Sequence, residues 1–419
     1  MTGNNIRFDL SDWLIHFFRD IDLDGNNPID FPEHMGWSNI AEDTKYPALF
    51  MLRCALRHGK LWATWAIRGG VRTIYGPSPA VCFSEMPIAA FLEAGAQRQR
   101  RGEAMSPYAL IFPKNEMFRL GANPVIYGLD DRNTFPLYST NVSARMFPNS
   151  VLPSREQYRY VTYNPASERP IDWTHEREWR WPYRADLRDI EDELSTYGII
   201  SDYEDMPGLE FFKKDIQGIG VVVETEEQVE WIVSDILTLV DRKIVSSSTY
   251  SFILPANLLP PTNDMITPSQ TADVINRSLI NISPFLESTN YNNPSIINDI
   301  SVLANQAKIA TPPKNYNETG ECWLWILDNN STFCRTLLYA NLLTISNSGK
   351  YLYLPPEFRN ISNLREKEEA TKNLAKLISK NYSVECGYHS VLDSSDPNGV
   401  PFYASDHIQN HRYYNVTWK

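Results

Sequence analysis

A short segment of the chain carries two acidic side chains at alternate positions. Residues 174–180 read THEREWR, and in an extended backbone Glu176 and Glu178 would share one face of a strand. Two neighbouring carboxylates make each other harder to ionise, so they are stable where a cation or a polar ligand faces them. In transfer or hydrolysis at a sugar carbon, such a carboxylate can stabilise an oxocarbenium-like centre and hold a ribose hydroxyl. The alternative interpretation is an exposed strand with surface ion pairs of little energetic value.

Two further segments could serve the same chemistry. His16 lies inside the apolar run LIHFF, where an imidazole needs a polar partner. The alternative is a core histidine whose hydrogen bonds are satisfied. The tetrapeptide CFSE at 82–85 follows a Gly-Pro-Ser-Pro turn and precedes an expected helix. There, Phe83 could stack on a flat ring and Ser84 could orient a carboxylate.

Several common catalytic motifs are absent from the sequence. It contains no GxxxxGK[ST] phosphate loop, no GxGxxG after a strand, no HExxH, no CxxC pair and no GxSxG elbow. NTP hydrolysis and Rossmann-type dinucleotide binding are therefore poorly supported. The remaining chemistry must depend on carboxylates, histidines and arginines.

The elements that must position these residues follow from apolar spacing. Strands are expected at 11–18, 79–84, 108–112, 124–127, 176–182 and 218–224, and helices at 46–58, 88–101 and 226–239. Gly59 is expected to end the first helix. Farther on, helices are expected at 267–282, 296–310 and 366–379, strands at 322–326 and 351–354, and β-structure from 382 onward. Strands and helices do not alternate regularly, which favours an α+β fold.

The chain length and a change in composition predict two domains. A chain of 419 residues is too long for one ordinary core. The proline- and asparagine-rich stretch PANLLPPTN at 255–263 resembles a linker. We therefore expect an N-terminal domain over 1–257 and a smaller α+β domain over 258–419. The second domain is expected to sense a trigger, bind a partner protein or select the target.

Composition also predicts a compartment. No run approaches the roughly 20 apolar residues of a membrane span, and the first residues, MTGNNIRFDLSDW, do not resemble a secretory signal. The five cysteines are an odd number, which suits reduced thiols. These features predict a cytoplasmic protein without membrane attachment. The net charge of −12 disfavours a broad nucleic-acid-coating surface but allows a local basic groove.

The order of several N-terminal segments is shared with a known family. These segments are Ile15–Phe17, Val81–Pro87, Tyr108–Phe112 with Lys114, Gly121–Tyr127 and His175–Arg180. Over roughly residues 11–185 the chain resembles the AbiGi-type family of abortive phage-infection proteins. The resemblance implies an anti-phage defence effector, as in toxin–antitoxin systems.

The same layout is more loosely similar to ADP-ribosyltransferases of the poly-ADP-ribose polymerase and DarT types. That resemblance implies an ADP-ribosyltransferase-like fold for 1–257 and NAD as the substrate. The acceptor of ADP-ribose would be nucleic acid or protein, or NAD would simply be cleaved. The implied catalytic residues are Glu178, which would hold the ribose 2′-hydroxyl, and Glu176, which would position the acceptor. The implied NAD-binding residues are His16, Phe83, Ser84, Arg19 and Arg53.

Two other functional classes remain open. One is a non-enzymatic antitoxin or sensor module, in which the EREWR segment is a structural ion-pair ladder. The other is a metal-dependent nuclease that uses Glu85, Glu176 and Glu178.

Three smaller features have structural interpretations beside functional ones. Cys386, His389, His407 and His411 have spacing that zinc could use, but a hairpin could separate them, and we assign no metal. The basic turn at 98–101 suits a helix C-terminus and could also contact phosphate. Trp323 and Trp325 are expected to share one strand face in a core.

Overall fold

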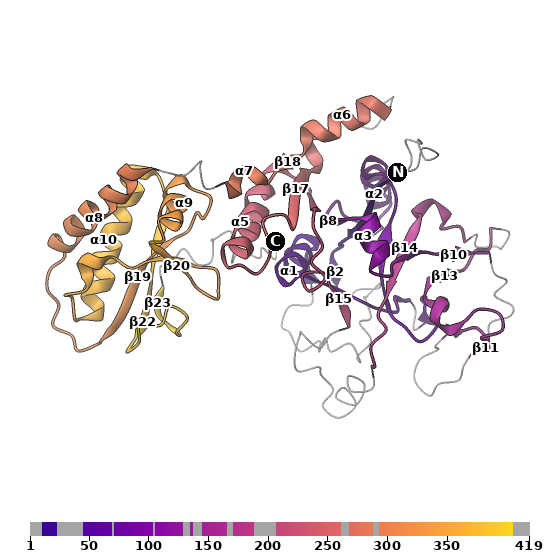
Figure 1. The fold of residues 1–419 in the computed structure, drawn as a ribbon, viewed down its shortest axis with the longest axis horizontal. Coiled ribbons are helices and arrows are strands. Elements are labelled where there is room, and N and C mark those ends of the chain that lie inside the picture. Colours follow the sequence, from indigo (N-terminus) through magenta and orange to yellow (C-terminus); the bar gives the residue numbers. More distant parts are fainter. Residues whose placement is uncertain are drawn as a thin grey trace. The chain divides into compact units, whose positions relative to one another are not determined.

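The computed structural model describes residues 11–22, 45–68, 71–103, 105–128, 135–136, 145–165, 171–187, 207–260, 268–287 and 293–404. It is a mixed α+β structure, as the sequence predicted, with one large N-terminal sheet and a separate C-terminal antiparallel sheet (Figure 1). Contacts divide the chain into two compact units. Unit 1 contains 1–228, 248–280 and 417–419, and unit 2 contains 229–247 and 281–416. The boundary expected near 258 therefore falls inside the stretch 248–280, which belongs to unit 1.

An eight-stranded sheet forms the centre of unit 1. Its order is β18 (Ile280–Asn281), β17 (Tyr250–Pro255), β16 (Ile219–Val223), β8 (Ala109–Pro113), β1 (Trp13–Phe17), β7 (Ala80–Ser84), β14 (Glu178–Pro182) and β9 (Asn123–Pro124). β16 and β17 are parallel. From β16 to β9 all neighbouring strands are antiparallel. β1 therefore lies between two strands that come much later in the sequence.

Several helices accompany this sheet. They are α1 (Ala48–His58), α2 (Ile88–Arg100), α3 (Lys114–Arg119), α6 (Pro268–Ser278) and the short 3₁₀ helices η3 (Ser154–Arg159), η4 (Thr174–Glu176), η6 (Glu226–Gln228) and η7 (Ala256–Leu258). α2 covers one face of the sheet, where Phe91 packs with Ile15 and Ile111. This side is called the α2 face below. Thr267, where the helix expected at 267–282 begins, lies outside the described residues.

Short strand pairs complete unit 1. They are β2 (Ile21–Asp22) with β3 (Lys45–Tyr46), β4 (Lys60–Trp62) with β15 (Gly208–Glu210), β5 (Ile67–Arg68) with β6 (Val71–Arg72), β10 (Ile126–Tyr127) with β13 (Tyr160–Val161), and β11 (Phe135–Pro136) with β12 (Arg145–Met146). The strand expected at 124–127 is divided, because β9 pairs with β14 while β10 pairs with β13.

The end of α1 confirms the expected cap. Gly59 adopts the left-handed conformation with φ 65°, and its N–H donates to the carbonyl of Ala55. A Cβ atom at this position would lie 2.1 Å from the ring of Phe212. Glycine is required here both for its backbone conformation and for the close approach of an aromatic ring.

Unit 2 is built on a five-stranded antiparallel sheet. Its order is β20 (Leu343–Ile345), β21 (Tyr351–Tyr353), β19 (Gly320–Ile326), β22 (Cys386–Leu392) and β23 (Pro401–Ala404). The helices are α5 (Val229–Asp241), α7 (Ser283–Leu286), α8 (Pro294–Ile309), α9 (Thr332–Tyr339) and α10 (Leu364–Tyr382), with the 3₁₀ turn η10 (Pro356–Phe358). Capping side chains begin three of them: Asn293 for α8, Ser331 for α9 and Asn363 for α10.

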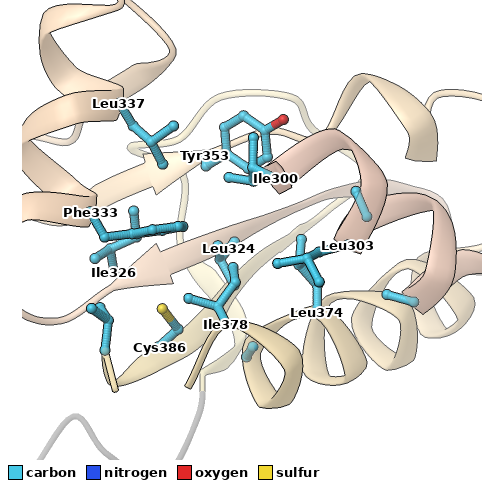
Figure 2. Packing of buried hydrophobic residues seen from close by; sticks show 14 of the residues in the cluster. Ile300, Leu303, Leu324, Ile326, Phe333, Leu337, Tyr353, Leu374, Ile378 and Cys386 are labelled. Carbon is cyan, nitrogen blue, oxygen red and sulfur yellow. The ribbon is translucent and has the colours of Figure 1, made fainter. Parts of the chain in front are cut away.

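The core of unit 2 lies between its helices and one face of the sheet. Figure 2 shows Ile300 and Leu303 of α8 and Leu374 of α10 directed toward Leu324 and Ile326 of β19. Burial of this apolar face explains why α8 and α10 run close to the expected 296–310 and 366–379. Within the described parts of the chain, no helix combines the length and apolarity that a membrane crossing needs.

Candidate active site

The two glutamates of the EREWR segment do not share a strand. Glu176 ends the 3₁₀ helix η4, Arg177 is left-handed with φ 47° and ψ 50°, and β14 begins at Glu178. The expectation of an extended backbone from 176 was therefore wrong. A left-handed non-glycine residue costs about 1–2 kcal/mol, so surrounding contacts must hold it. Here the carbonyl of Arg177 accepts from the N–H of Glu85 at 3.1 Å.

Glu178 is held by a two-point ion pair with Arg180. Nε of Arg180 lies 2.7 Å from Oε1 of Glu178, and Nη2 lies 3.2 Å from Oε2. The buried guanidinium also donates to the carbonyls of Tyr158 and Tyr160 at 2.7 and 3.1 Å. Because two backbone carbonyls hold Arg180 in place, Arg180 holds the carboxylate in place too. The side chain of Glu178 keeps 19% of its surface exposed, so the carboxylate remains reachable.

Glu176 lies beside the last turn of α2. Its Oε1 is 2.5 Å from Nη1 of Arg98. The same guanidinium contacts Glu103 at 2.6 Å and lies 6.0 Å from the ring centre of Trp173. Ser84 donates from Oγ to the backbone carbonyl of Glu176 at 2.8 Å. Arg98, in the basic last turn of α2, thus has a specific partner in Glu176, which the sequence pattern of the turn did not predict.

Tyr127 completes the group around Glu178. Its hydroxyl donates to the carbonyl of Trp173 at 3.0 Å. Burial and, to a smaller extent, the nearby charge of Glu178 together raise the pKa of Tyr127 to about 12. The phenol therefore stays protonated at neutral pH and can act only as a hydroxyl. Ser84, Arg98, Tyr127, Glu176, Glu178 and Arg180 are called the Glu178 cluster below.

His16 lies on the other face of the sheet. Ser84 pairs with Ile15 in β1 and with Glu178 in β14, so these three side chains share the α2 face. The next residue along β1, His16, must point the opposite way. There its ring lies 5.7 Å from that of Phe83. The resemblance implied that His16 and Glu178 contribute to one NAD site, whereas strand register places their side chains on opposite faces of the sheet.

The imidazole of His16 serves the fold. Nδ1 donates to the carbonyl of Cys82 at 2.9 Å, where β1 and β7 keep only one paired position, at Ile15 and Ser84. Burial lowers the pKa of His16 to about 4, and this hydrogen bond offsets part of that effect. The ring is neutral at pH 7. It replaces a missing backbone contact between two strands.

Of the other expected NAD-binding residues, Phe83, Arg53 and Arg19 lie outside the Glu178 cluster. Phe83 is 3% exposed and packs edge-on against Phe112, so little of its ring is open to a ligand. Arg53 is 2% exposed on α1. Both Arg53 and the half-buried Arg19 interact with other parts of the protein. Ser84 alone of this set lies beside Glu178.

Each of the three carboxylates considered for a nuclease forms an ion pair with a different basic side chain. Glu85 binds Lys114 at 2.9 Å and accepts from Nε1 of Trp179 at 2.7 Å. Glu176 and Glu178 bind the arginines described above. In the part of the chain that the structure describes, no group of three or more His, Cys, Asp or Glu residues is arranged to hold a metal ion.

Cys386 and His389 do not form a ligand pair either. Cys386 belongs to the apolar core under the helices. His389 is three residues farther along the same strand, and side chains three apart on a strand point to opposite faces. His407 and His411 lie outside the described residues.

Sequence comparison finds a family model that matches part of unit 2. Residues 287–416, less than a third of the chain, match the family described as "protein of unknown function (DUF4427)". No curated protein and no solved structure matches the chain.

Proposed function

We propose that unit 1 has an ADP-ribosyltransferase-like fold and transfers ADP-ribose from NAD in anti-phage defence. The acceptor would be nucleic acid or protein, and water as acceptor would make the reaction NAD hydrolysis. The observation that supports this proposal most is the Glu178 carboxylate, held at two points by Arg180 yet still partly exposed. A preorganised anion of this kind stabilises positive charge that develops in a transition state.

The proposed reaction occurs at C1′ of the nicotinamide-side ribose. The bond from C1′ to nicotinamide breaks, and its electron pair leaves with nicotinamide. Glu178 stabilises the positive charge on the sugar and accepts a hydrogen bond from a ribose hydroxyl. The acceptor oxygen or nitrogen then forms a bond to C1′ and releases its proton. In this proposal Glu176 takes that proton, after the acceptor displaces Arg98 from its carboxylate.

The register of the sheet changes the roles expected for other residues. In this proposal His16 and Phe83 hold β1 against β7 from the opposite face and do not contact NAD. Ser84 keeps its place beside Glu178, where it fixes the backbone of Glu176. Tyr127 supplies a protonated hydroxyl near the carboxylate. In this proposal Arg98, paired with Glu176, and Arg180, paired with Glu178, take the place of Arg19 and Arg53 as the cations beside the reacting groups.

A second candidate function is a non-enzymatic antitoxin or sensor module. One observation favours it: Glu85, Glu176 and Glu178 are each already ion-paired. A ladder of this kind can specify a structure without chemistry. In either case we propose that unit 2 binds the partner or the trigger.

Glu178→Gln separates the two functions. We expect wild-type protein, incubated with labelled NAD and total cell nucleic acid and protein, to release nicotinamide or transfer label. Glu178→Gln should reduce that rate by roughly 10²–10³-fold, the usual effect of removing one stabilising group from a transition state. Glu103→Gln is the control, because Glu103 is likewise ion-paired with an arginine, Arg98, but lies at the surface outside the Glu178 cluster. Wild-type protein that neither consumes NAD nor transfers label would support the binding module.

A further inference from the structure

The residue before Glu178 and the residue after it are both bonded to Glu85. The backbone N–H of Glu85 donates to the carbonyl of Arg177 at 3.1 Å. Its carboxylate accepts from Nε1 of Trp179 at 2.7 Å through Oε2. Glu85 comes directly after β7, the strand that pairs with β14. One residue therefore holds the chain on both sides of Glu178.

The carboxylate of Glu85 is bonded on the side of the sheet away from the Glu178 cluster. Trp179 follows Glu178 in β14, so its side chain points away from the α2 face. The indole of Trp179 occupies Oε2 of Glu85, and Nζ of Lys114 lies 2.9 Å from Oε1. Both oxygens are thus engaged by other side chains. This arrangement suits a residue that acts through its neighbours and does not touch the substrate.

Lys114 anchors the carboxylate of Glu85 to the start of β1. The backbone N–H of Lys114 donates to the carbonyl of Asp12 at 2.8 Å, and its ammonium donates to the carbonyl of Ser11. The side chains of Lys114 and Glu85 are 22% and 15% exposed, so water screens this pair less than it screens a surface pair. Glu85 is therefore itself fixed and can fix the segment that is bonded to it.

The backbone at Arg177 determines how far apart the two candidate catalytic carboxylates lie. Glu176 ends η4, Glu178 begins β14, and the left-handed Arg177 between them makes the turn. A left-handed non-glycine residue is unfavourable by itself and persists only where other contacts hold it. Glu85 supplies one such contact at the carbonyl of Arg177. Ser84 supplies another, because its Oγ donates to the carbonyl of Glu176.

We propose that Glu85 is a positioning residue of the candidate active site. By holding the residues on both sides of Glu178, it fixes the distance between this carboxylate and that of Glu176. This role rests on the proposed function, in which one carboxylate stabilises charge at C1′ and the other takes the proton of the acceptor that bonds to C1′. Both must reach the same sugar carbon, and a displacement of about 1 Å can lower a rate by about 10²-fold.

Trp179→Phe tests this role with little change in shape. It removes the indole N–H that reaches Glu85 and keeps an aromatic ring. Trp181→Phe is the matched control, because Trp181 lies in the same strand and its Nε1 donates to the carbonyl of Leu120 at 2.9 Å, outside the Glu178 cluster. Each substitution removes one indole hydrogen bond, so denaturant unfolding should show similar losses of stability. Only Trp179→Phe should disturb the reaction.

Nicotinamide release from NAD by the full-length protein gives the kinetic comparison. We expect Trp179→Phe to lower kcat by roughly tenfold without changing the KM for NAD, because a displaced Glu178 loses an interaction made only in the transition state. Trp181→Phe should leave kcat unchanged. Glu85→Gln keeps one oxygen that can accept a hydrogen bond, so it should retain more of kcat than Glu85→Ala.

Amide hydrogen exchange gives a second readout that does not depend on NAD. Exchange at the N–H groups of Glu85 and Arg177 should be faster in Trp179→Phe than in Trp181→Phe. If wild-type protein releases nicotinamide and the two variants have equal kcat, the positioning role is wrong while the proposed function stands. If wild-type protein releases no nicotinamide, the proposed function fails and exchange decides the rest. Equal exchange in the two variants then overturns the role of Glu85, and faster exchange in Trp179→Phe supports its hold on the two carboxylates.

Discussion

Glu178 and Arg180 form a two-point ion pair between residues that point to the same face of one strand. The guanidinium is buried and the carboxylate is partly exposed, so the pair presents one anion to the α2 face. Arg180 also donates to two backbone carbonyls of the 158–160 stretch. This single arginine therefore joins the candidate active site to the rest of unit 1.

Replacing Arg180 should destabilise unit 1 strongly. Arg180→Gln leaves Glu178 without its cation and two buried carbonyls without their donor. Breaking a buried pair by removing one partner costs about 3–5 kcal/mol in the free energy of unfolding. Denaturant unfolding measures this change. Arg119→Gln is the control, because the Arg119–Glu116 pair is exposed and should contribute no more than about 1 kcal/mol.

Asp241 should be equally important for unit 2. It accepts from Arg335 at 2.5 Å and from the hydroxyl of Tyr351 at 2.6 Å, so it joins α5 to α9 and β21. Asp241→Asn removes the carboxylate partner of the buried guanidinium, and we expect a loss of about 3–5 kcal/mol in the free energy of unfolding, measured by thermal or denaturant unfolding. Glu369→Gln, in the more exposed pair with Lys314, should change stability by less than about 1 kcal/mol. Equal effects of the two substitutions would contradict this account.

Two glycines separate backbone strain from steric contact. Gly59 and Gly102 both have positive φ, 65° and 80°. A Cβ atom at Gly59 would clash with the ring of Phe212, whereas no atom of the described residues lies within 4 Å of a Cβ atom at Gly102. Gly102→Ala should cost about 1 kcal/mol from strain alone. Gly59→Ala should cost more, because Phe212 must also move. The difference in melting temperature between the two variants measures the destabilisation caused by the steric contact with Phe212.

His16 should make unit 1 less stable in mild acid. Its folded pKa of about 4 lies below the ordinary value of 6.5, so the unfolded chain binds the proton more readily. The contribution of neutral His16 is complete above pH 6.5 and is lost as pH falls toward 4. Linkage predicts a loss of about 2 kcal/mol by pH 5.

His16→Phe, which keeps a ring on the same aromatic face, tests this dependence. The variant loses the hydrogen bond to Cys82 at every pH, but its stability should fall less between pH 7 and 5 than that of the wild type. Denaturant unfolding of both proteins at the two pH values gives the comparison. Identical pH dependence would show that His16 does not titrate as inferred.

The sequence by itself determined the local elements and the fold class. Short apolar runs predicted β1, β7, β8 and β16, and helical spacing of apolar residues predicted α1, α2, α8 and α10. Gly59 marked a helix cap. These features depend on near neighbours in the sequence. The irregular order of strands and helices was sufficient to predict an α+β structure.

The candidate site depended on contacts between distant segments, which only the tertiary structure decided. Whether His16 and Glu178 meet is determined by how β1 and β14 align on β7, and a shift of one residue in register moves a side chain to the other face of a sheet. The left-handed Arg177 is stabilised by a backbone contact with Glu85, far away in sequence. The partners of Glu176 and Tyr127 likewise come from other segments, and no local pattern encodes them.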